Sequence, residues 1–420
     1  MVSWSLLIIA LPFLATEASP AIFDVKEFGA RGDGRTVDTK AIQQAIDACA
    51  KAGGGMVLLP AGHYLSGPIE LKGKLTFYLE DGAMLQATSR HQDFMDRPGD
   101  WLNASSSDFL PLISGKDLSD LNITGKGVID GNGKHWWGPA EEARQKRPGY
   151  TLPRPNLIVL TRCRNVRITG LTIQNSPKFH IVPTECEDVA IERVNIKAPP
   201  DAPNTDGIDP SRSRRVRISH CIIDVGDDNV AIKASRPVAG SEFACEDITV
   251  QDCQFLHGHG MSIGSETAGG VRNVIVQRCT FKDTENGIRI KTARDRGGRV
   301  VALRCTDISM TDVDRAITIT CYYPRIPQED ANQPVTELTP RIMDITIKNL
   351  TATCPNEAGM IIGLPESNVK DVLLENVRIT AKTGFTIRNA KGVRLRDVQV
   401  ETGSGPAFIL RDADVEGLSR

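Results

Sequence analysis

The sequence is poor in aromatic residues and carries almost no net charge. Phe, Trp and Tyr make up 5% of its 420 residues, whereas 40% are hydrophobic, so we expect a core built from aliphatic side chains. A formal net charge of −2 predicts no general attraction to nucleic acid or to anionic membranes. An acidic polymer would therefore have to be held by a local cluster of basic residues.

Apolar runs long enough to span a membrane are also missing. One shorter apolar run stands out, and it lies at the N-terminus. Residues 6–15 are apolar but include Pro12, and the run is about half the length of a membrane-spanning helix. Such a run is typical of a secretory signal peptide, although residues 1–5 lack the usual Lys or Arg. We expect residues 1–18 to be a signal peptide and the protein to be secreted or periplasmic; a buried N-terminal strand is the alternative.

The His and Cys spacing of zinc sites is absent as well. We therefore expect no metal and no cofactor.

Residues 22–70 precede the regular part of the chain. A helix is expected over residues 39–52, capped by Asp38 and stopped by Gly53. Its apolar stripe consists of Ile42, Ala45, Ile46 and Cys49. A solenoid exposes the core of its first coil, so an amphipathic helix at this end is expected to cover it.

Further along, the chain repeats a short pattern of three apolar residues. One residue separates the first from the second, and two residues separate the second from the third. The units begin with Val166-x-Ile168-x-x-Leu171, and the next are headed by Val189, Val216, Ile248, Val274, Val300, Ile345, Val372 and Val393. Alternation within each unit predicts a strand. Most units recur every 21 to 32 residues, which is too short for a β-propeller blade, and almost no helical pattern lies between them.

These features predict an all-β fold, a right-handed parallel β-helix. Residues 71–420 would form the coil, continuous with the cap and first strands of residues 22–70 as one domain.

The ten cysteines fit this interpretation. Cys221, Cys253, Cys279 and Cys305 end four consecutive units, and Cys163, Cys186 and Cys245 precede three others. Equivalent residues of stacked coils lie about 4.8 Å apart. We expect ladders of buried thiols, with disulfides between neighbours as the alternative.

A second strand follows each unit and can be aligned on an apolar anchor. The anchors are Ile208, Val230, Met261, Ile288 and Ile317. Asp206, Asp228 and His259 stand two residues before an anchor. Arg289 stands one residue after Ile288, and Lys291 stands three residues after it. If the anchors are core, these five side chains project outward together. Asp227 would point the other way in a regular strand, and a bend at Gly226 would let it reach the same groove.

Each of these motifs alone has an ordinary explanation. Asp-Gly and Asp-Asp pairs usually mark turns, and a histidine between glycines is more often a loop residue. Their coincidence on neighbouring coils favours chemistry, because like charges stacked at strand spacing repel each other.

With these residues the chain resembles the family 28 glycoside hydrolases, the polygalacturonase family. Its four motifs occur here in order as residues 204–206 (Asn-Thr-Asp), 226–228 (Gly-Asp-Asp), 258–260 (Gly-His-Gly) and 289–291 (Arg-Ile-Lys). The resemblance implies single-displacement hydrolysis of α-1,4-galacturonosyl linkages in pectin, with inversion.

The resemblance also implies a role for each site residue. Asp227 would be the general acid, Asp206 and Asp228 the bases, and His259 would tune the acid. Substrate would be bound by Arg289, Lys291, Tyr323, Asn204 and His180, although a structural role for His180 is an equal alternative. The partner would be an acidic polysaccharide, and a monomer is expected.

Several alternatives remain open at this point. The substrate could be rhamnogalacturonan or xylogalacturonan. The protein could also be a calcium-dependent pectate lyase, with the aspartates as ligands, or a non-catalytic glycan-binding β-helix. Endo or exo action cannot be read from the sequence; insertions at residues 86–115, 139–156 and 321–340 are candidates for closing one end of the groove.

Overall fold

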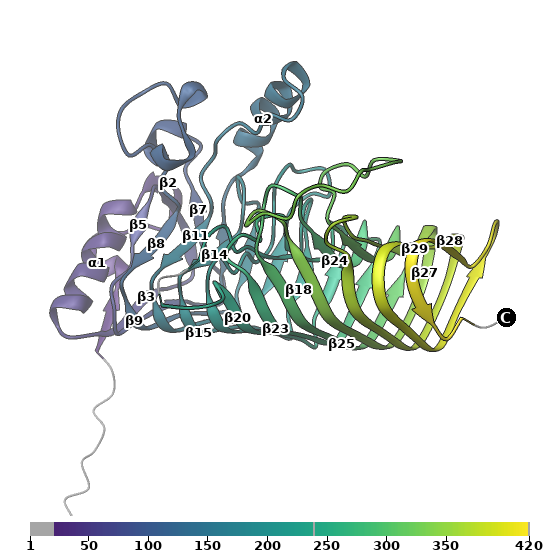
Figure 1. The fold of residues 1–420 in the computed structure, drawn as a ribbon. Coiled ribbons are helices and arrows are strands. Elements are labelled where there is room, and N and C mark those ends of the chain that lie inside the picture. Colours follow the sequence, from purple (N-terminus) through teal and green to yellow (C-terminus); the bar gives the residue numbers. More distant parts are fainter. Residues whose placement is uncertain (1–20, 238–239, 419–420) are drawn as a thin grey trace, which may run out of the picture.

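The computed structural model describes residues 21–237 and 240–418. The chain winds into a long coil of parallel strands (Figure 1), which confirms the predicted right-handed parallel β-helix. The expected signal peptide, residues 1–18, lies outside the described residues. No helix within the described ranges has the length and apolar character needed to cross a membrane.

Each turn of the coil contributes strands to three faces. The first face runs through β1 (Ile22–Asp24), β3 (Gly55–Leu59), β6 (Leu75–Leu79), β9 (Ser119–Gly125), β12 (Arg164–Thr169), β15 (Glu187–Glu192), β17 (Arg214–Ser219), β20 (Cys245–Gln251), β23 (Val271–Lys282), β25 (Arg299–Thr311), β27 (Arg341–Ile362) and β28 (Val369–Thr402). The second face runs through β2 (Asp33–Val37), β4 (Gly62–Ser66), β7 (Ala83–Ala87), β10 (Val128–Asp130), β13 (Thr172–Gln174), β16 (Asn195–Lys197), β18 (Ile222–Asp224) and β21 (Gln254–Leu256), which pairs with β23.

The third face carries the polar motifs. It begins with β5 (Ile69–Glu70), β8 (Ile113–Lys116), β11 (Ile158–Thr161) and β14 (Ile181–Thr184), and continues with β19 (Val230–Ile232), β22 (Met261–Gly264), β24 (Asn286–Lys291), β26 (Arg315–Thr320), β27, β28 and β29 (Phe408–Glu416). Isolated bridges at Ile208 connect β14 to β19.

The predicted alignment of the anchors is confirmed. Ile208 pairs with Val230, Val230 with Met261, Met261 with Ile288, and Ile288 with Ile317. All five anchors are at most 2% exposed. Neighbouring coils are therefore in the register that sets the polar residues beside one another.

One repeat was aligned wrongly. The sequence places Val300 level with Val274, but in the structure Leu303 is the partner of Val274 and Cys305 is the partner of Val276. Cys305 therefore does not continue the ladder of Cys279, which pairs with Ile308. The shift by three residues arises because Val300, Leu303 and Cys305 are all buried and apolar, so periodicity alone does not choose between them.

Within the first predicted ladder, Cys221, Cys253 and Cys279 keep equivalent positions on adjacent coils. All ten are free and buried, which confirms buried thiols over disulfides. Cys163 donates its backbone N–H to the sulfur of Cys186 at 3.4 Å. These side chains act as small apolar residues of the coil interior.

The predicted N-terminal helix is confirmed as α1 (Thr39–Lys51), with its stripe buried as expected. It contacts β1, β3 and β5 and lies at the N-terminal end of the coil (Figure 1). The prediction that Asp38 caps this helix is wrong, because Asp38 accepts the backbone N–H groups of Arg31 and Gly32 instead. Gly53 follows the helix with φ of 92°, a conformation suited to glycine.

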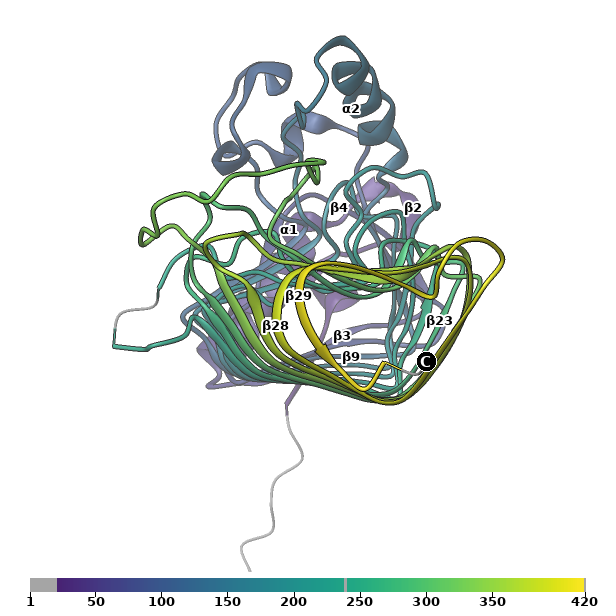
Figure 2. The ribbon, with the colours of Figure 1, turned by 45° about the vertical axis from the view of Figure 1, so that its right-hand side comes forward.

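Two insertions rise above the coil on one side. The helix α2 (Lys134–Lys146) was not predicted, and it stands clear of the strands beside the segment of residues 86–115 (Figures 1 and 2). That segment contains the short 3-10 helices η2 (His91–Phe94), η3 (Trp101–Asn103) and η4 (Ser106–Asp108); a further one, η1 (Val25–Phe28), precedes β2.

Candidate functional site

A polar pocket of about 180 Å³ opens beside the third face. Its lining includes Asn204, Asp206, Asp227, Asp228, Lys233, Lys291 and Tyr323. These residues come from separate coils, and the register of the strands brings them together. The pocket therefore contains the three aspartates that the sequence predicted to meet.

Two tight turns place the aspartates. Asn204 has φ of 54°, a left-handed conformation that asparagine tolerates better than most residues. Gly226 donates its N–H to the hydroxyl oxygen of Thr205 at 2.9 Å, and a Cβ at Gly226 would collide with the carbonyl oxygen of Ala202. The chain bends at Gly226 as predicted, and both Asp227 and Asp228 reach the pocket.

Asp227 is held by an imidazole and an amide. His259 Nδ1 lies 3.0 Å from Asp227 Oδ1, and His259 Nε2 lies 3.1 Å from Glu285 Oε2. Asn204 Nδ2 donates to Asp227 Oδ2 at 3.3 Å. Because both partners of the ring are carboxylates, both ring nitrogens act as donors and the imidazole is favoured in its charged form.

These contacts shift both pKa values. Burial acts to raise the pKa of Asp227, but the hydrogen bond and charge of His259, followed by the charge of Lys291, outweigh burial and hold this pKa well below its ordinary value. Burial acts to lower the pKa of His259, and the hydrogen bond and charge of Asp227 outweigh it, so that this pKa is raised. In the unliganded site the two groups therefore form an ion pair.

Asp228 is almost fully buried and lies against two cations. Lys291 Nζ donates to Asp228 Oδ2 at 2.6 Å, and Ser262 Oγ donates to Asp228 Oδ1 at 2.8 Å. Arg289 Nη1 lies 3.8 Å from Asp228 Oδ1 and is buried without a hydrogen-bond partner among the described residues. The pair of basic residues predicted from the Arg-Ile-Lys motif thus converges on this carboxylate.

Asp206 belongs to a second buried charge cluster. Lys233 Nζ donates to Asp206 Oδ2 at 2.9 Å and to Asp209 Oδ2 at 2.6 Å. Burial, and then the charge of Asp209, raise the pKa of Asp206 well above its ordinary value. Burial likewise raises the pKa of Asp209 to about 6, although Lys233 opposes it. One ammonium group does not offset the burial of two carboxylates.

This cluster makes the stability of the fold depend on pH. The ordinary pKa of an aspartate is 3.8, and that of Asp209 in the folded protein is about 6. Between these two pH values Asp209 is protonated more often in the folded protein than in the unfolded chain, so the stability of the fold falls as pH rises through that interval. The raised pKa of His259 extends the decline to higher pH, since the stability from its charged form is lost as pH rises through the folded pKa.

We expect the free energy of unfolding to decrease by on the order of 2 kcal/mol over this interval through Asp209 alone. In Asp209→Asn the slope between about pH 4 and pH 6 should flatten, whatever the absolute stability of the variant. Urea denaturation at a series of pH values measures this, and an unchanged slope in the variant would contradict the assignment.

The prediction that His180 binds sugar is contradicted. His180 is 0% exposed, its Nδ1 lies 2.9 Å from the carbonyl oxygen of Asp206, and its Nε2 accepts the backbone N–H of Ser176. Burial lowers the pKa of this imidazole to about 4. The neutral ring connects two coils from inside and supports the backbone at Asp206, which is the alternative that the sequence left open.

The two adjacent tyrosines have different surroundings. Tyr323 lines the pocket, with its ring centroid 5.5 Å from Lys291 Nζ. Tyr322 is buried, and its hydroxyl donates to Asp330 Oδ2 at 2.6 Å. This arrangement leaves Tyr323 as the one of the pair that a ligand in the pocket can contact.

Three of these groups are close enough to share a cation. Single ligand atoms of Asp227, Asp228 and His259 lie within 4.8 Å of one another. However, the ammonium of Lys291 already contacts Asp228 and the imidazole already donates to Asp227. Calcium prefers oxygen ligands, so neither the nitrogen donor nor the resident ammonium suits it.

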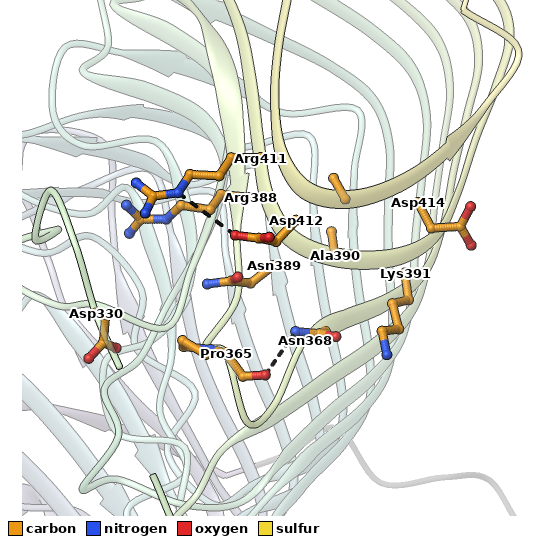
Figure 3. Close-up of a pocket in the computed structure, with 11 residues that line it drawn as sticks. Asp330, Pro365, Asn368, Arg388, Asn389, Ala390, Lys391, Arg411, Asp412 and Asp414 are labelled. Carbon is orange, nitrogen blue, oxygen red and sulfur yellow. Dashed lines mark hydrogen bonds and ion pairs between the residues drawn. The ribbon is translucent and has the colours of Figure 1, made fainter. Parts of the chain in front are cut away.

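A larger cavity of about 580 Å³ lies near the C-terminal coils (Figure 3). Arg388 and Arg411 are register partners on its wall. Arg388 donates to the carbonyl oxygens of Pro327 and Gln328, and Arg411 also donates to that of Gln328. These arginines hold the 321–340 insertion against the coil, and none of the predicted site residues lines this cavity.

Some residues of the site were not singled out from the sequence. Lys233 occupies the same register position as Lys291, three residues after its anchor, and that alignment was the available signal. Arg154 donates to Asn204 Oδ1 at 2.8 Å, and Glu285 pairs with His259. Arg154 comes from an insertion with no repeat, so no pattern pointed to it.

Comparisons with known proteins point to one family. The family model described as glycosyl hydrolases family 28 matches residues 49–401. An endo-polygalacturonase of Pectobacterium carotovorum subsp. carotovorum is 32% identical over 366 residues, 84% of this chain and 86% of the relative. The structure of a family 28 exopolygalacturonase from Yersinia enterocolitica superposes with a TM-score of 0.80 at 25% identity, over 96% of this chain and 79% of that one. The structure of a polygalacturonase from Erwinia carotovora ssp. carotovora superposes with a TM-score of 0.72 at 28% identity, over 97% of this chain and 99% of that one.

Proposed function

The chain belongs to family 28 of the glycosyl hydrolases, and on that premise we propose that it hydrolyses the α-1,4 linkages between galacturonate residues of polygalacturonate, with inversion and without a metal. One observation carries this proposal. Asp206, Asp227 and Asp228 share a pocket with Lys291, so groups for acid–base chemistry stand beside a cation that can bind a sugar carboxylate.

We assign the roles of the aspartates as follows. Asp227 protonates the glycosidic oxygen as general acid, and Asp206 and Asp228 activate the attacking water as bases. An inverting pair needs space for that water between the carboxyl groups. The side chain of Asp227 is 20% exposed, whereas Asp206 and Asp228 are 3% and 2% exposed as residues, which supports Asp227 as the group that meets the leaving oxygen.

The low pKa of Asp227 in the empty site must change when substrate binds. A galacturonate carboxylate held by Lys291 would partly neutralise one of the charges that depress this pKa, and would place a negative charge nearby. The sugar ring would also displace water from the pocket. All three effects favour the protonated form of Asp227, so we propose that it takes up its proton in the substrate complex.

Arg289, Lys291 and Tyr323 would bind the sugar on one side of the scissile bond. Arg289 Nη1 is buried with no hydrogen-bond partner among the described residues, and a carboxylate would provide one. Asn204 contributes mainly by orienting Asp227. We further propose that the enzyme acts outside the cytoplasm as a monomer on this acidic polysaccharide; the N-terminal apolar run supports export.

A reaction assay distinguishes this function from its alternatives. On polygalacturonate we expect new reducing ends, no ultraviolet-absorbing unsaturated product and full activity in the presence of a chelator. A calcium-dependent lyase would release an unsaturated product that absorbs in the ultraviolet, and a chelator would abolish its activity. A glycan-binding protein would bind the polymer without producing reducing ends. Parallel reactions with rhamnogalacturonan and xylogalacturonan determine which pectic polymer is preferred.

A further inference from the structure

The imidazole of His259 lies between two cavities. Asp227 lines the polar pocket of about 180 Å³ described above. His259 borders a second cavity of about 270 Å³ instead, together with Gly258 and Glu285. The side chains of His259 and Glu285 are 33% and 39% exposed, so both reach water through this second cavity. The ring therefore lies behind Asp227, and a sugar in the polar pocket need not displace it.

Backbone hydrogen bonds fix three successive coils at this point. The N–H of His259 donates to the carbonyl oxygen of Asp227 at 2.8 Å, and the N–H of Glu285 donates to that of Gly258 at 2.8 Å. Gly258 has φ of 78°, and a Cβ there would lie 2.4 Å from the carbonyl oxygen of Asp227. Only glycine allows so close an approach. The backbone thus sets Asp227, His259 and Glu285 side by side before their side chains make any contact.

Glu285 determines which proton the ring can give away. Its Oε2 lies 3.1 Å from His259 Nε2, and Asp227 Oδ1 lies 3.0 Å from His259 Nδ1. If the charged ring loses the proton on Nδ1, the neutral ring keeps its proton on Nε2, where Glu285 accepts it. Loss of the Nε2 proton would instead leave two acceptors in contact. The arrangement therefore favours Nδ1 as the donor and Asp227 as the recipient.

The charges around the ring favour its protonated form. The titratable groups that border the second cavity with His259 are Glu285, Asp283, Asp312, Asp314 and His257, which in turn pairs with Asp224. Within the described part of the chain, the lining of this cavity includes no lysine or arginine. Burial acts to lower the pKa of His259, but the hydrogen bond and charge of Asp227 and the charges of Asp228 and Glu285 outweigh it. The resting ring thus carries a proton that it can transfer.

We propose that Glu285 is a positioning residue for the reaction, which holds the ring of His259 so that Nδ1 stores the catalytic proton and passes it to Asp227 when the sugar binds. This inference rests on the proposed function and names the source of the proton that Asp227 takes up. The proton moves from Nδ1 to Asp227 Oδ1, and then to the glycosidic oxygen as its bond to the anomeric carbon breaks. After the product leaves, Nδ1 takes a proton from water, and the proton that the base removed from the attacking water returns to solvent.

The test is the pH dependence of kcat/KM on polygalacturonate for wild type, Glu285→Gln and Glu285→Asp. This ratio reports the ionisation of the free enzyme, so activity should be lost as pH rises through the pKa of His259. Glu285→Gln keeps an acceptor for Nε2 but removes the charge, so this alkaline limb should move to lower pH by about half a unit or more. KM at low pH should change little, because Glu285 does not line the polar pocket. Glu285→Asp keeps the charge and should stay closer to wild type.

Asp312→Asn is the matched control, because it removes an exposed carboxylate of the same cavity, whereas the ring of His259 pairs with Asp227 and Glu285. It should keep the wild-type limb. If wild type forms no reducing ends from polygalacturonate, the proposed function fails. If wild type is active and Glu285→Gln keeps the wild-type limb, or loses activity equally at every pH, only the role of Glu285 fails.

NMR of the histidine rings tests the same point without an activity assay. His259, assigned by the signal that disappears in His259→Ala, should titrate at lower pH in Glu285→Gln than in wild type. An unchanged titration would overturn the inference, whatever the rates of the variants.

Discussion

Asp227→Asn is expected to lower kcat on polygalacturonate by about 10²- to 10⁴-fold, the range that a general acid contributes. The substitution keeps the shape of the side chain, and its amide oxygen can still accept from His259 Nδ1 and from the backbone N–H of Asp228, which Asp227 Oδ1 accepts at 2.8 Å. Folding and KM should therefore change little. Initial rates of reducing-end release, with circular dichroism as a check on folding, measure the effect.

An activated substrate separates the acid from the bases. When the leaving group is a good one, such as a phenol of low pKa, protonation of the glycosidic oxygen matters less. Asp227→Asn should then recover much of the lost rate, whereas Asp206→Asn and Asp228→Asn should stay slow because water activation is still needed. This comparison is decisive, since Asp206 is the carboxyl whose pKa is raised in the empty site. If Asp206→Asn recovered its rate on the activated substrate and Asp227→Asn did not, Asp206 would be the general acid and Asp227 a base.

Arg289→Ala is expected to produce the second-largest loss, about 10- to 100-fold in kcat/KM. It removes a guanidinium whose buried Nη1 lies 3.8 Å from Asp228 Oδ1 and has no hydrogen-bond partner among the described residues. KM should rise because the sugar carboxylate loses a contact. The rate constant kcat should also fall, because the guanidinium no longer positions the sugar carboxylate beside Asp228.

Two further variants define what Arg289 contributes. Arg289→Lys keeps the charge but not the planar fork, so it should lie between wild type and Arg289→Ala. Arg394→Ala removes an exposed arginine of β28 and should have no effect on the kinetics. Wild-type KM in Arg289→Ala would show that this residue does not bind substrate.

The sequence predicted the coil and most of the pocket because both follow from one repeated pattern. Ile208, Val230, Met261 and Ile288 were aligned correctly, and this alignment brings the coils that carry Asp206, Asp228 and Lys291 next to one another. The period of two residues explains why Lys291, three residues after its buried anchor, points outward. Asp206 and Asp228 stand two residues before their anchors, and they reach the pocket because the backbone there is irregular and not part of a strand.

The errors have local causes. Cys305 was assigned to the third apolar position of its repeat, but it occupies the second. Several buried apolar residues lie close together in β25, and periodicity does not distinguish between them. His180 occupies an outward register position in the sequence, yet the irregular turn before β14 directs its ring inward to two backbone groups. Arg154 reaches the site from an insertion, and long-range approach of an irregular segment leaves no periodic signal.

Proton NMR of the first product released from polygalacturonate tests the central claim most directly. If aspartates from adjacent coils act as a general acid and a base on opposite sides of the sugar, the new reducing end must appear first as the β-anomer, since the linkage cleaved is α. The α-anomer would then grow only by mutarotation. Initial release of the α-anomer, or of an unsaturated sugar, would contradict this account.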